Sequence, residues 1–273
     1  GGAEQFNVTI GKLNINQGLL EFLDENFTPL HVKEFSITAG SKIVVEDMDA
    51  LTDLGTSEFN PAEEDFFSNY LHRTYLEADQ FTGIGVELDF VNQAGEILPQ
   101  MDIDAVRTLK TGDTVVGEAH YSELLFTADG IEGGKGSINL GYLLSALNAY
   151  ENQTIGISNH AGGSELDALL TGKGGFTFDA HSEPIILTHS NNYTGDTIVN
   201  QGKVILGNDQ ALGGIDLEKQ TGQLILNGGS VDLAGFTQDV DSVQSKKGTI
   251  LDLAGGTLKI NPTEAAWATY SQS

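Results

Sequence analysis

Short apolar runs that end at glycine or asparagine recur through the C-terminal half of the chain. Residues rich in Val, Ile, Leu and Thr favour strands, whereas Gly and Asn favour tight turns. The runs hold about three to six strand-forming residues each, and they occupy 197–202, 203–207, 223–229, 230–235, 249–256 and 257–260. This pattern predicts a series of short strands joined by tight turns.

One short pattern occurs twice in this region. Val231-Asp-Leu-Ala-Gly235 recurs further along the chain as Leu251-Asp-Leu-Ala-Gly255. Repeats of about 20 to 50 residues are typical of solenoids and propellers. A coil of roughly 20 residues fits a parallel β-helix, whose coils stack at the strand spacing of about 4.8 Å. Alternation then places the first and third residues of each copy inside the coil, and Asp232 and Asp252 outside.

Similar strand signals occur in two further regions. Glycine-flanked runs predict more coils over 131–190, at 136–141, 153–157, 174–178 and 183–188. Short strands are also predicted near the N-terminus, at 6–10, 12–15, 35–37 and 43–45. Residues 143–150 are compatible with a brief helical turn, and the sequence leaves this open.

Residues 55–121 have a different pattern, which predicts an insertion between coils at 1–54 and coils at 122–273. Asn60-Pro-Ala-Glu63 is a helix-start signature, and aromatic residues four apart follow it, so a helix is predicted near 61–76. Residues 84–90 alternate like a half-buried strand, and 92–95 form a plausible hairpin turn into 96–98. The aromatic residues of the helix are expected on its core side rather than on a binding face: Phe66, Phe67, Tyr70 and Tyr75.

The charge and composition exclude several classes of function. The chain has 39 acidic and 13 basic residues among 273, for a net charge of −26. Such a surface repels phosphate backbones and anionic lipids, so we expect neither nucleic-acid nor peripheral membrane binding. The absence of cysteine excludes disulfides, thiol catalysis and zinc–thiolate sites. No apolar run approaches the roughly 20 residues of a membrane helix.

Metal and cofactor sites are not predicted. The six histidines are scattered and show no metal-ligand spacing: His31, His72, His120, His160, His181 and His189. His181 and His189 are the one pair that a single turn brings close, but a metal site there is not expected. The glycine-rich stretch 130–136 lacks the ending of a phosphate-binding loop, and Glu132 repels phosphate. It is interpreted as a turn of the solenoid.

Two aspartates are the strongest candidates for catalysis. Carboxylates on adjacent coils of a β-helix, such as Asp232 and Asp252, come near the separation of about 5–9 Å that glycosidases use. The same residues also cap turns and keep an outer face polar, and this structural role is preferred. A serine-protease motif is absent, because Gly163-Ser164-Glu165 lacks the nucleophile context. We therefore expect no catalytic residues and no enzyme.

A family resemblance begins at Asn192. Residues 192–207, NYTGDTIVNQGKVILG, followed by Ala211-Leu-Gly213, closely resemble the passenger-associated transport repeat of autotransporters. The preceding stretches 125–129, 136–142 and 172–175 are similar to the same family, in the same order. The resemblance covers about 122–260, whereas residues 1–121 match nothing identifiable.

The resemblance implies a passenger domain of an adhesin-type (AIDA-like) autotransporter at the surface of a Gram-negative bacterium. The expected fold is all-β, a right-handed parallel β-helix exported by type V secretion through a C-terminal β-barrel that this chain, ending at Ser273, does not include. The implied function is adhesion, cell aggregation or biofilm formation, with host-cell or matrix glycans or proteins, or other copies, as partners. No ligand-binding residue is assigned. A passive stalk for another domain and a carbohydrate-active enzyme remain the alternatives.

Overall fold

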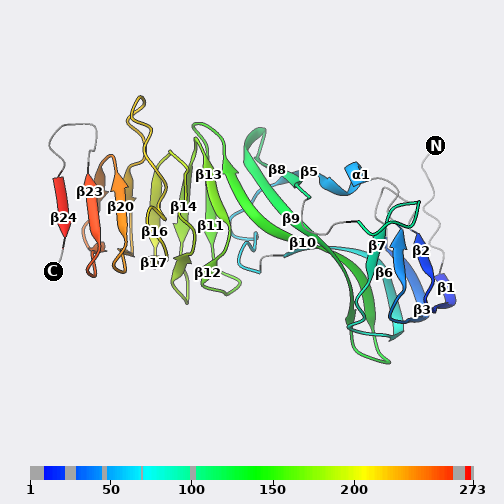
Figure 1. Ribbon diagram of the computed structural model, residues 1–273. Coiled ribbons are helices and arrows are strands. Elements are labelled where there is room, and N and C mark those ends of the chain that lie inside the picture. The colour runs from blue at the N-terminus through cyan, green and yellow to red at the C-terminus, as the bar shows by residue number, and fades with distance from the viewer. Residues whose placement is uncertain are drawn as a thin grey trace. The chain divides into compact units, whose positions relative to one another are not determined.

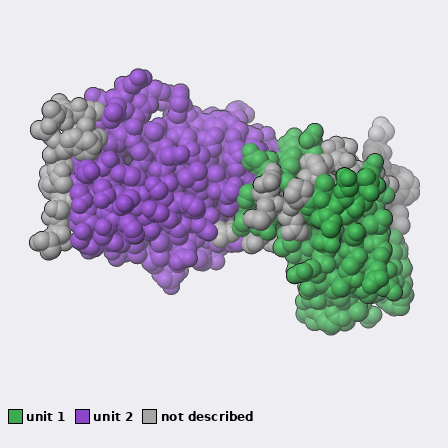
Figure 2. All heavy atoms as spheres, viewed as in Figure 1, with its two compact units in different colours: residues 1–53, 70–105, 122–143 green, residues 54–69, 106–121, 144–273 purple. Residues whose placement is uncertain are grey.

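The computed structural model describes residues 9–21, 29–44, 48–68, 70–98, 103–260 and 268–271 (Figure 1). It is all-β with mostly parallel sheets, as predicted, apart from the short helix α1 (Met48–Thr52). Two compact units divide the chain (Figure 2). Unit 1 contains 1–53, 70–105 and 122–143, and unit 2 contains 54–69, 106–121 and 144–273. The predicted insertion, 55–121, therefore has residues in both units.

Unit 1 holds a sheet in which strands far apart in sequence lie side by side. Its order is β1 (Thr9–Ile15), β3 (Leu30–Ile37), β6 (Tyr70–Thr82), β10 (Gly136–Ala149) and β9 (Thr114–Gly130). Of the last two strands, only the residues within 122–143 belong to unit 1. β1, β3 and β6 are parallel, and β6 and β10 are antiparallel. A smaller parallel sheet contains β2 (Leu19–Glu21), β4 (Lys42–Val44) and β7 (Asp89–Val91).

The strands predicted near the N-terminus are found in these two sheets. The segments 9–10 and 12–15 lie in the one strand β1, 35–37 lie in β3, and 43–44 lie in β4. The remaining residues of those predictions, 6–8 and 45, lie outside the described residues. The strand pattern of this region is therefore confirmed where the structure describes it.

The alternation of side chains along β6 separates a core face from an outer face. Leu76 and Ala78 are buried, whereas Glu77 and Asp79 between and after them are exposed. The core that these residues join is rich in aromatic side chains, and Phe35 and Phe81 pack with ring centroids 5.0 Å apart. Because successive strand residues point to opposite faces, the acidic side chains of β6 gather on the outer face.

Unit 2 consists mainly of two five-stranded parallel sheets that the chain visits in turn. The first contains β11 (Thr154–Ser158), β14 (Gly175–Asp179), β16 (Thr197–Gln201), β18 (Leu224–Leu226) and β21 (Val243–Ser245). The second contains β12 (Glu165–Leu166), β15 (Ile185–Leu187), β17 (Lys203–Leu206), β19 (Ser230–Asp232) and β22 (Ile250–Asp252). Each return of the chain to a sheet adds the next neighbouring strand, so successive segments stack as coils.

The remaining strands of unit 2 pair in other sheets. β13 (Leu169–Gly172) pairs in parallel with β10, and β20 (Thr237–Val240) pairs in parallel with β23 (Thr257–Ile260). β24 (Ala268–Ser271) is antiparallel to β23. β10, β9, β8 (Ala105–Thr111) and β5 (Asp53–Glu58) follow one another in the sheet order.

The two copies of the repeated sequence pattern lie in register on neighbouring strands. Asp232 of β19 pairs with Asp252 of β22, which confirms the predicted relation between the two copies. In the first copy Val231 and Leu233 are fully buried, as predicted. The corresponding leucines of the second copy are only partly buried. The prediction that the first and third residues of each copy point inward is therefore confirmed for the first copy and only partly for the second.

One coil is longer than its neighbours and keeps the same register. Phe176 pairs with Thr197, and Thr197 in turn pairs with Leu224, so the second of these steps uses more of the chain than the first. The additional residues lie between β17 and β18, where Asp216 and Thr221 form an isolated bridge. The strands on either side continue their parallel pairing. The extra chain length is thus accommodated outside the sheets.

The predicted helix near 61–76 is wrong. Asn60 does cap a single turn, since its side-chain oxygen accepts from the Ala62 N–H at 3.1 Å. The chain then leaves the helical path at Asp65, whose carboxylate accepts from the N–H groups of Phe67 and Ser68. This local bonding competes with helix formation. The second half of the predicted helix is the start of β6, which pairs with β3 and β10.

The other predictions for this region have mixed outcomes. The hairpin turn is confirmed, because the Gly95 N–H donates to Asn92 O and Val91 bridges Ile97. The strand over 84–90 is wrong except at its end, where β7 begins at Asp89, although burial does alternate along it. Residues 143–149 belong to strand β10, so no helical turn forms there.

Candidate functional site

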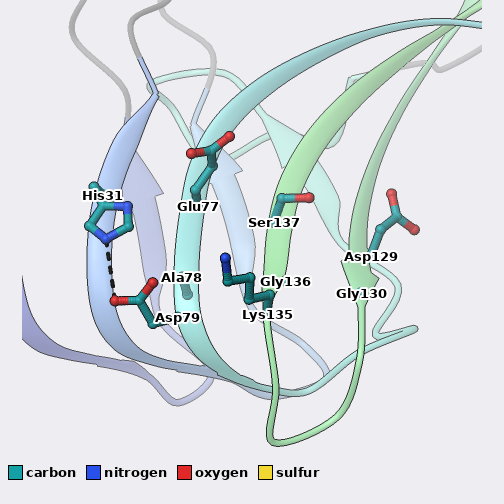
Figure 3. A pocket seen from close by; sticks show the side chains of 9 residues that line it. All are labelled: His31, Glu77, Ala78, Asp79, Asp129, Gly130, Lys135, Gly136 and Ser137. Carbon is teal, nitrogen blue, oxygen red and sulfur yellow. Dashed lines mark ion pairs between the residues drawn. The ribbon is translucent and has the colours of Figure 1, made fainter.

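A groove of about 440 Å³ lies on the outer face of the unit 1 sheet (Figure 3). Side chains from β3, β6, β9 and β10 and the turn between β9 and β10 form its walls. Its charged and polar lining residues are His31, Glu77, Asp79, Asp129, Lys135 and Ser137. The volume is within the range of about 300–1,000 Å³ that is usual for ligand pockets. Because it brings charged and polar side chains from four strands together, this groove is a candidate site.

Ion pairing leaves part of this charge available. His31 lies 3.4 Å from Asp79, measured from Nε2 to Oδ2. Glu77 and Lys135 form no ion pair with any of the described residues, and Glu77 is exposed. In Figure 3 the Lys135 side chain reaches from the turn toward β6. The groove therefore contains charged groups of both signs that are not neutralised in pairs.

A buried amide fixes one carboxylate of the groove. Asn139 is 9% exposed, and its Nδ2 donates to Asp129 Oδ2 at 2.9 Å and to Ser137 Oγ at 3.0 Å. Its Oδ1 accepts from Thr74 Oγ1 at 2.8 Å. A register shift in β10 between Ile138 and Asn139 places both of these consecutive side chains in buried positions. Such irregularities re-aim side chains and are common beside functional sites.

The side-chain carboxylate of Glu132 holds the turn beside the groove in place. Glu132 Oε2 accepts from the N–H groups of Gly83 and Ile84, each at 3.0 Å. These two hydrogen bonds, first that of Ile84 and then that of Gly83, lower the pKa of Glu132 below its ordinary value. Residues 130–136 do form a turn, since the Ile131 N–H donates to Lys135 O at 2.9 Å. This turn joins β9 to β10, which are neighbours in one sheet, and so it is not shown to be a turn of a solenoid.

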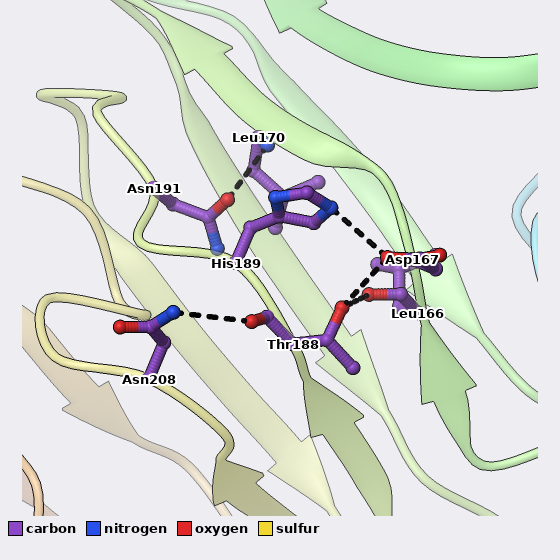
Figure 4. A network of polar contacts seen from close by, with 7 residues as sticks. All are labelled: Leu166, Asp167, Leu170, Thr188, His189, Asn191 and Asn208. Carbon is purple, nitrogen blue, oxygen red and sulfur yellow. Dashed lines mark hydrogen bonds and ion pairs between the residues drawn. The ribbon is translucent and has the colours of Figure 1, made fainter.

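The outer face of unit 2 carries a line of polar contacts across three stacked coils (Figure 4). Asp167 Oδ1 accepts from Thr188 Oγ1 at 3.1 Å and lies 3.0 Å from His189 Nε2. Asn208 on the next coil donates to Thr188 O at 3.5 Å. We call Asp167, Thr188, His189 and Asn208 the polar stripe. Its contacts join neighbouring coils and leave its edges open to solvent.

The histidines whose side chains the structure describes do not gather around a metal-binding centre. His181 contacts Ser158 Oγ at 3.1 Å through Nε2, and its ring lies 6.4 Å from that of His160, whereas His189 contacts Asp167. The pair considered from the sequence, His181 and His189, thus has separate partners. No group of three or more metal-ligating side chains occurs in the described ranges. The side chain of His72 lies outside the described residues.

Glu118 and Tyr150 form a hydrogen-bonded pair in unit 2, and the pKa of each is shifted. The Tyr150 hydroxyl donates to Glu118 Oε1 at 2.5 Å, and His120 Nε2 lies 3.1 Å from Glu118 Oε2. The hydrogen bond to Glu118 raises the pKa of Tyr150 to about 12, whereas it lowers the pKa of Glu118. The pair joins β9 to the end of β10 and does not line the groove.

The two repeated aspartates are engaged in turns. Asp232 Oδ1 accepts from the Ala234 N–H at 2.9 Å, and Asp252 Oδ1 accepts from the Ala254 N–H at 3.0 Å. Both alanines have positive φ, so each carboxylate holds a left-handed turn. Asp232 also accepts from Lys203 Nζ at 2.7 Å, and this contact is the main cause of its lowered pKa. This geometry favours the structural role.

The aromatic residues considered from the sequence do not form a binding face. Phe66 and Phe67 are buried in unit 2, where Phe66 stacks on Phe59 with ring centroids 6.2 Å apart. Tyr75 is buried in unit 1 against Phe126. The core interpretation is confirmed for these residues, whereas the Tyr70 side chain lies outside the described residues.

The groove residues were only partly visible from the sequence. From the sequence, His31 is one of six scattered histidines and Lys135 belongs to a glycine-rich turn, and no motif identifies Glu77, Asp129 or Asn139 as site residues. The one local signal was the alternation of Glu77 and Asp79 with apolar residues in β6. The rest depends on strand pairing between distant segments.

Comparison with known proteins gives partial matches. The chain is 33% identical over 153 residues to the adhesin BmaC autotransporter of Brucella suis biovar 1 (strain 1330), covering 55% of this chain and 4% of that protein. It is 27% identical over 191 residues to the uncharacterized lipoprotein YdeK of Escherichia coli (strain K12), covering 68% of this chain and 13% of that protein. The uncharacterized protein YuaQ of the same organism is 27% identical over 135 residues, 48% of this chain and 9% of that protein.

These matches limit what is shown. No family model matches the chain, and no solved structure matches it. The chain spans no more than 13% of the curated relatives it matches. The similarity is to part of an autotransporter adhesin and to parts of uncharacterized proteins, and it is not specific to AIDA-like autotransporters. Within the described ranges, no helix is long and apolar enough to cross a membrane.

Proposed function

We propose that this chain is part of the passenger of an adhesin-type autotransporter, displayed at the surface of a Gram-negative bacterium by type V secretion. The observation that carries the proposal is the 33% identity to the BmaC adhesin over 153 residues. The stacked parallel coils of unit 2 support it, because such a stack fits a right-handed parallel β-helix. Its role is adhesion, cell aggregation or biofilm formation.

The mechanism we propose is binding through outward polar positions. The residues of the polar stripe lie on the outer face of successive coils, so substitutions there are expected to leave the apolar interior undisturbed. Many copies on one cell then turn weak individual contacts into firm attachment. The partners we propose are glycans or proteins of host cells or matrix, or further copies of the passenger on other cells.

We propose no catalytic role and no cofactor. The carboxylates that a carbohydrate-active enzyme would use, Asp232 and Asp252, each accept a backbone hydrogen bond within a turn. Replacing each by Asn is expected to leave glycan profiles unchanged. Cleavage of a glycan by the parent chain that is lost in either variant would contradict this part of the proposal.

The test is to display the chain on a non-aggregating bacterium beside a control that displays only the anchoring barrel. Settling of the culture and binding to host cells and matrix proteins are measured per displayed copy. The proposal predicts that settling, binding or both are greater for the displayed chain than for the control. Normal display with neither effect would contradict adhesion and leave a passive stalk as the function.

A further inference from the structure

The geometry points to the groove of unit 1 as a binding site for a guanidinium group, the side chain of an arginine in a partner protein. This inference deepens the proposed adhesive function and rests on it for its biological role. It begins from a row of side chains across four strands. His31 pairs with Glu77, and Glu77 pairs with Ser137.

Asp129 completes this row on the next strand. Ile131 N–H and Lys135 O close the turn between β9 and β10, so antiparallel counting places Asp129 opposite Ser137. Neighbouring strands lie about 4.8 Å apart, which puts the backbones of Glu77 and Asp129 about 10 Å apart on either side of Ser137. Two carboxylates thus flank a hydroxyl within the groove of about 440 Å³.

The carboxylate of Asp129 is held ready for a ligand. Its Oδ2 accepts from Asn139 Nδ2 and Thr127 Oγ1, and Asn139 is itself buried and fully bonded to its neighbours. Oδ1 of Asp129 has no hydrogen-bond partner among the described residues. A group whose orientation is already fixed loses little conformational freedom on binding.

Charge selects a cation for this groove. Three carboxylates, Glu77, Asp79 and Asp129, line it against one ammonium, that of Lys135. The net charge of −26 on the whole chain draws cations toward it and repels anionic ligands. Lys135 extends into the groove without reaching ion-pair distance of a described carboxylate. Asp79 is paired with His31, so Glu77 and Oδ1 of Asp129 are the acidic groups that remain open to a ligand.

The shape of the acceptor set favours guanidinium over ammonium. A guanidinium presents five N–H donors in a fixed plane and bonds carboxylates in a bidentate manner. Glu77, Asp129 and Ser137 Oγ offer acceptors on two sides and below such a plane. An ammonium, as a point charge with three donors, is expected to contact one carboxylate at a time. We therefore assign an arginine rather than a lysine side chain.

The test uses the purified full chain and three acetylated, amidated pentapeptides, Gly-Gly-Xaa-Gly-Gly, with arginine, lysine or citrulline at the centre. Binding is measured by calorimetry at low salt. The arginine peptide is expected to bind about tenfold more tightly than the citrulline peptide, which has the same shape without the charge, and more tightly than the lysine peptide. Equal binding of arginine and citrulline peptides, or no binding of the arginine peptide at millimolar concentration, would overturn the inference.

Variants locate the binding. Glu77→Gln and Asp129→Asn are each expected to weaken the arginine peptide about fivefold or more. Lys135→Gln is expected to strengthen it, because a competing cation is removed. The matched controls, Glu183→Gln and Lys173→Gln, make the same charge changes at exposed positions of unit 2 and are expected to change nothing. A weakening by Glu183→Gln equal to that by Glu77→Gln would assign binding to the net charge and reject the groove.

The outcome is separable from that of the proposed function. If the displayed chain adheres and Glu77→Gln adheres equally, with no arginine binding in solution, the groove inference fails and adhesion stands. If the arginine peptide binds in the groove but the displayed chain neither settles nor adheres, adhesion fails and the site stands. Circular dichroism of each variant checks that the exposed substitutions leave the fold intact.

Discussion

Asn191 provides a sharp test of how neighbouring coils are joined. Its side chain is 5% exposed, and its Oδ1 accepts from the Leu170 N–H at 2.8 Å. Its Nδ2 donates to Ala211 O at 2.7 Å. One amide therefore bridges the coil before it and the coil after it. Asn191→Ala removes both bonds and leaves a buried N–H and a buried carbonyl without a partner.

The expected cost follows from these two orphaned groups. Each unsatisfied buried polar group costs about 1–3 kcal/mol, so the two groups left by Asn191→Ala should lower the free energy of unfolding by about 2–6 kcal/mol. Asn191→Asp keeps an acceptor for Leu170 but turns a carboxylate oxygen toward the Ala211 carbonyl. It is expected to be at least as destabilising at neutral pH.

Urea unfolding followed by far-ultraviolet circular dichroism measures these differences. The matched control is Asn192→Ala, at the adjacent exposed position, which is expected to change the free energy of unfolding by less than about 0.5 kcal/mol. The reasoning is refuted if Asn191→Ala is as stable as Asn192→Ala, because the bridging amide would then contribute nothing.

Three further predictions concern packing, close approach and pH. Phe178→Ala, at a fully buried position, should destabilise the chain by about 3–5 kcal/mol in the same urea assay. The control Ile250→Ala, at a position 61% exposed, should change the stability little. Equal effects of the two substitutions would contradict the assignment of Phe178 to the core. Gly195→Ala should lower the melting temperature, since its Cβ would lie 2.2 Å from the Gly174 carbonyl carbon, whereas Gly11→Ala meets nothing within 4 Å and should not. Asp232 has a lowered pKa in the fold, chiefly through Lys203, so its carboxylate stabilises the fold above the ordinary Asp pKa and loses that effect as the pH falls through the lowered value. The stability difference between the parent chain and Asp232→Asn, measured by urea unfolding from pH 7 to pH 2, should therefore shrink toward low pH; a difference that stays constant would reject the role of the ion pair.

The sequence predicted the strands of unit 2 well because their signals are local. Glycine and asparagine end each run, and the repeat of Val231–Gly235 at 251–255 marks the stacking register directly. The prediction of a helix near 61–76 is wrong because the spacing of its aromatic residues has two explanations. Aromatic residues four apart fit one face of a helix, and they also fit a chain that turns and then enters a strand. Only the pairing of β6 with β3 and β10 decides between these.

The groove was beyond prediction for a related reason. Its residues come from positions 31, 77–79 and 129–137. The parallel pairing of β3 with β6 and the antiparallel pairing of β6 with β10 bring these distant segments together. Nothing in the spacing of Glu77 and Asp129 along the chain indicates that they flank Ser137. The β10 irregularity that buries Asn139 likewise depends on the pairing with β6. Local pattern therefore identified the strands, and tertiary pairing determined the site.

The longer coil between β17 and β18 has a practical consequence. The long step from Thr197 to Leu224 keeps the same parallel pairing as the shorter step from Phe176 to Thr197. We therefore expect the stacked strands to tolerate a change in the length of that connection. Leu217, 56% exposed, lies in this outward segment. A foreign epitope grafted between Gly214 and Gly222 would then be presented to solvent while the neighbouring coils keep their pairing, so the chain offers a ready scaffold for peptide display.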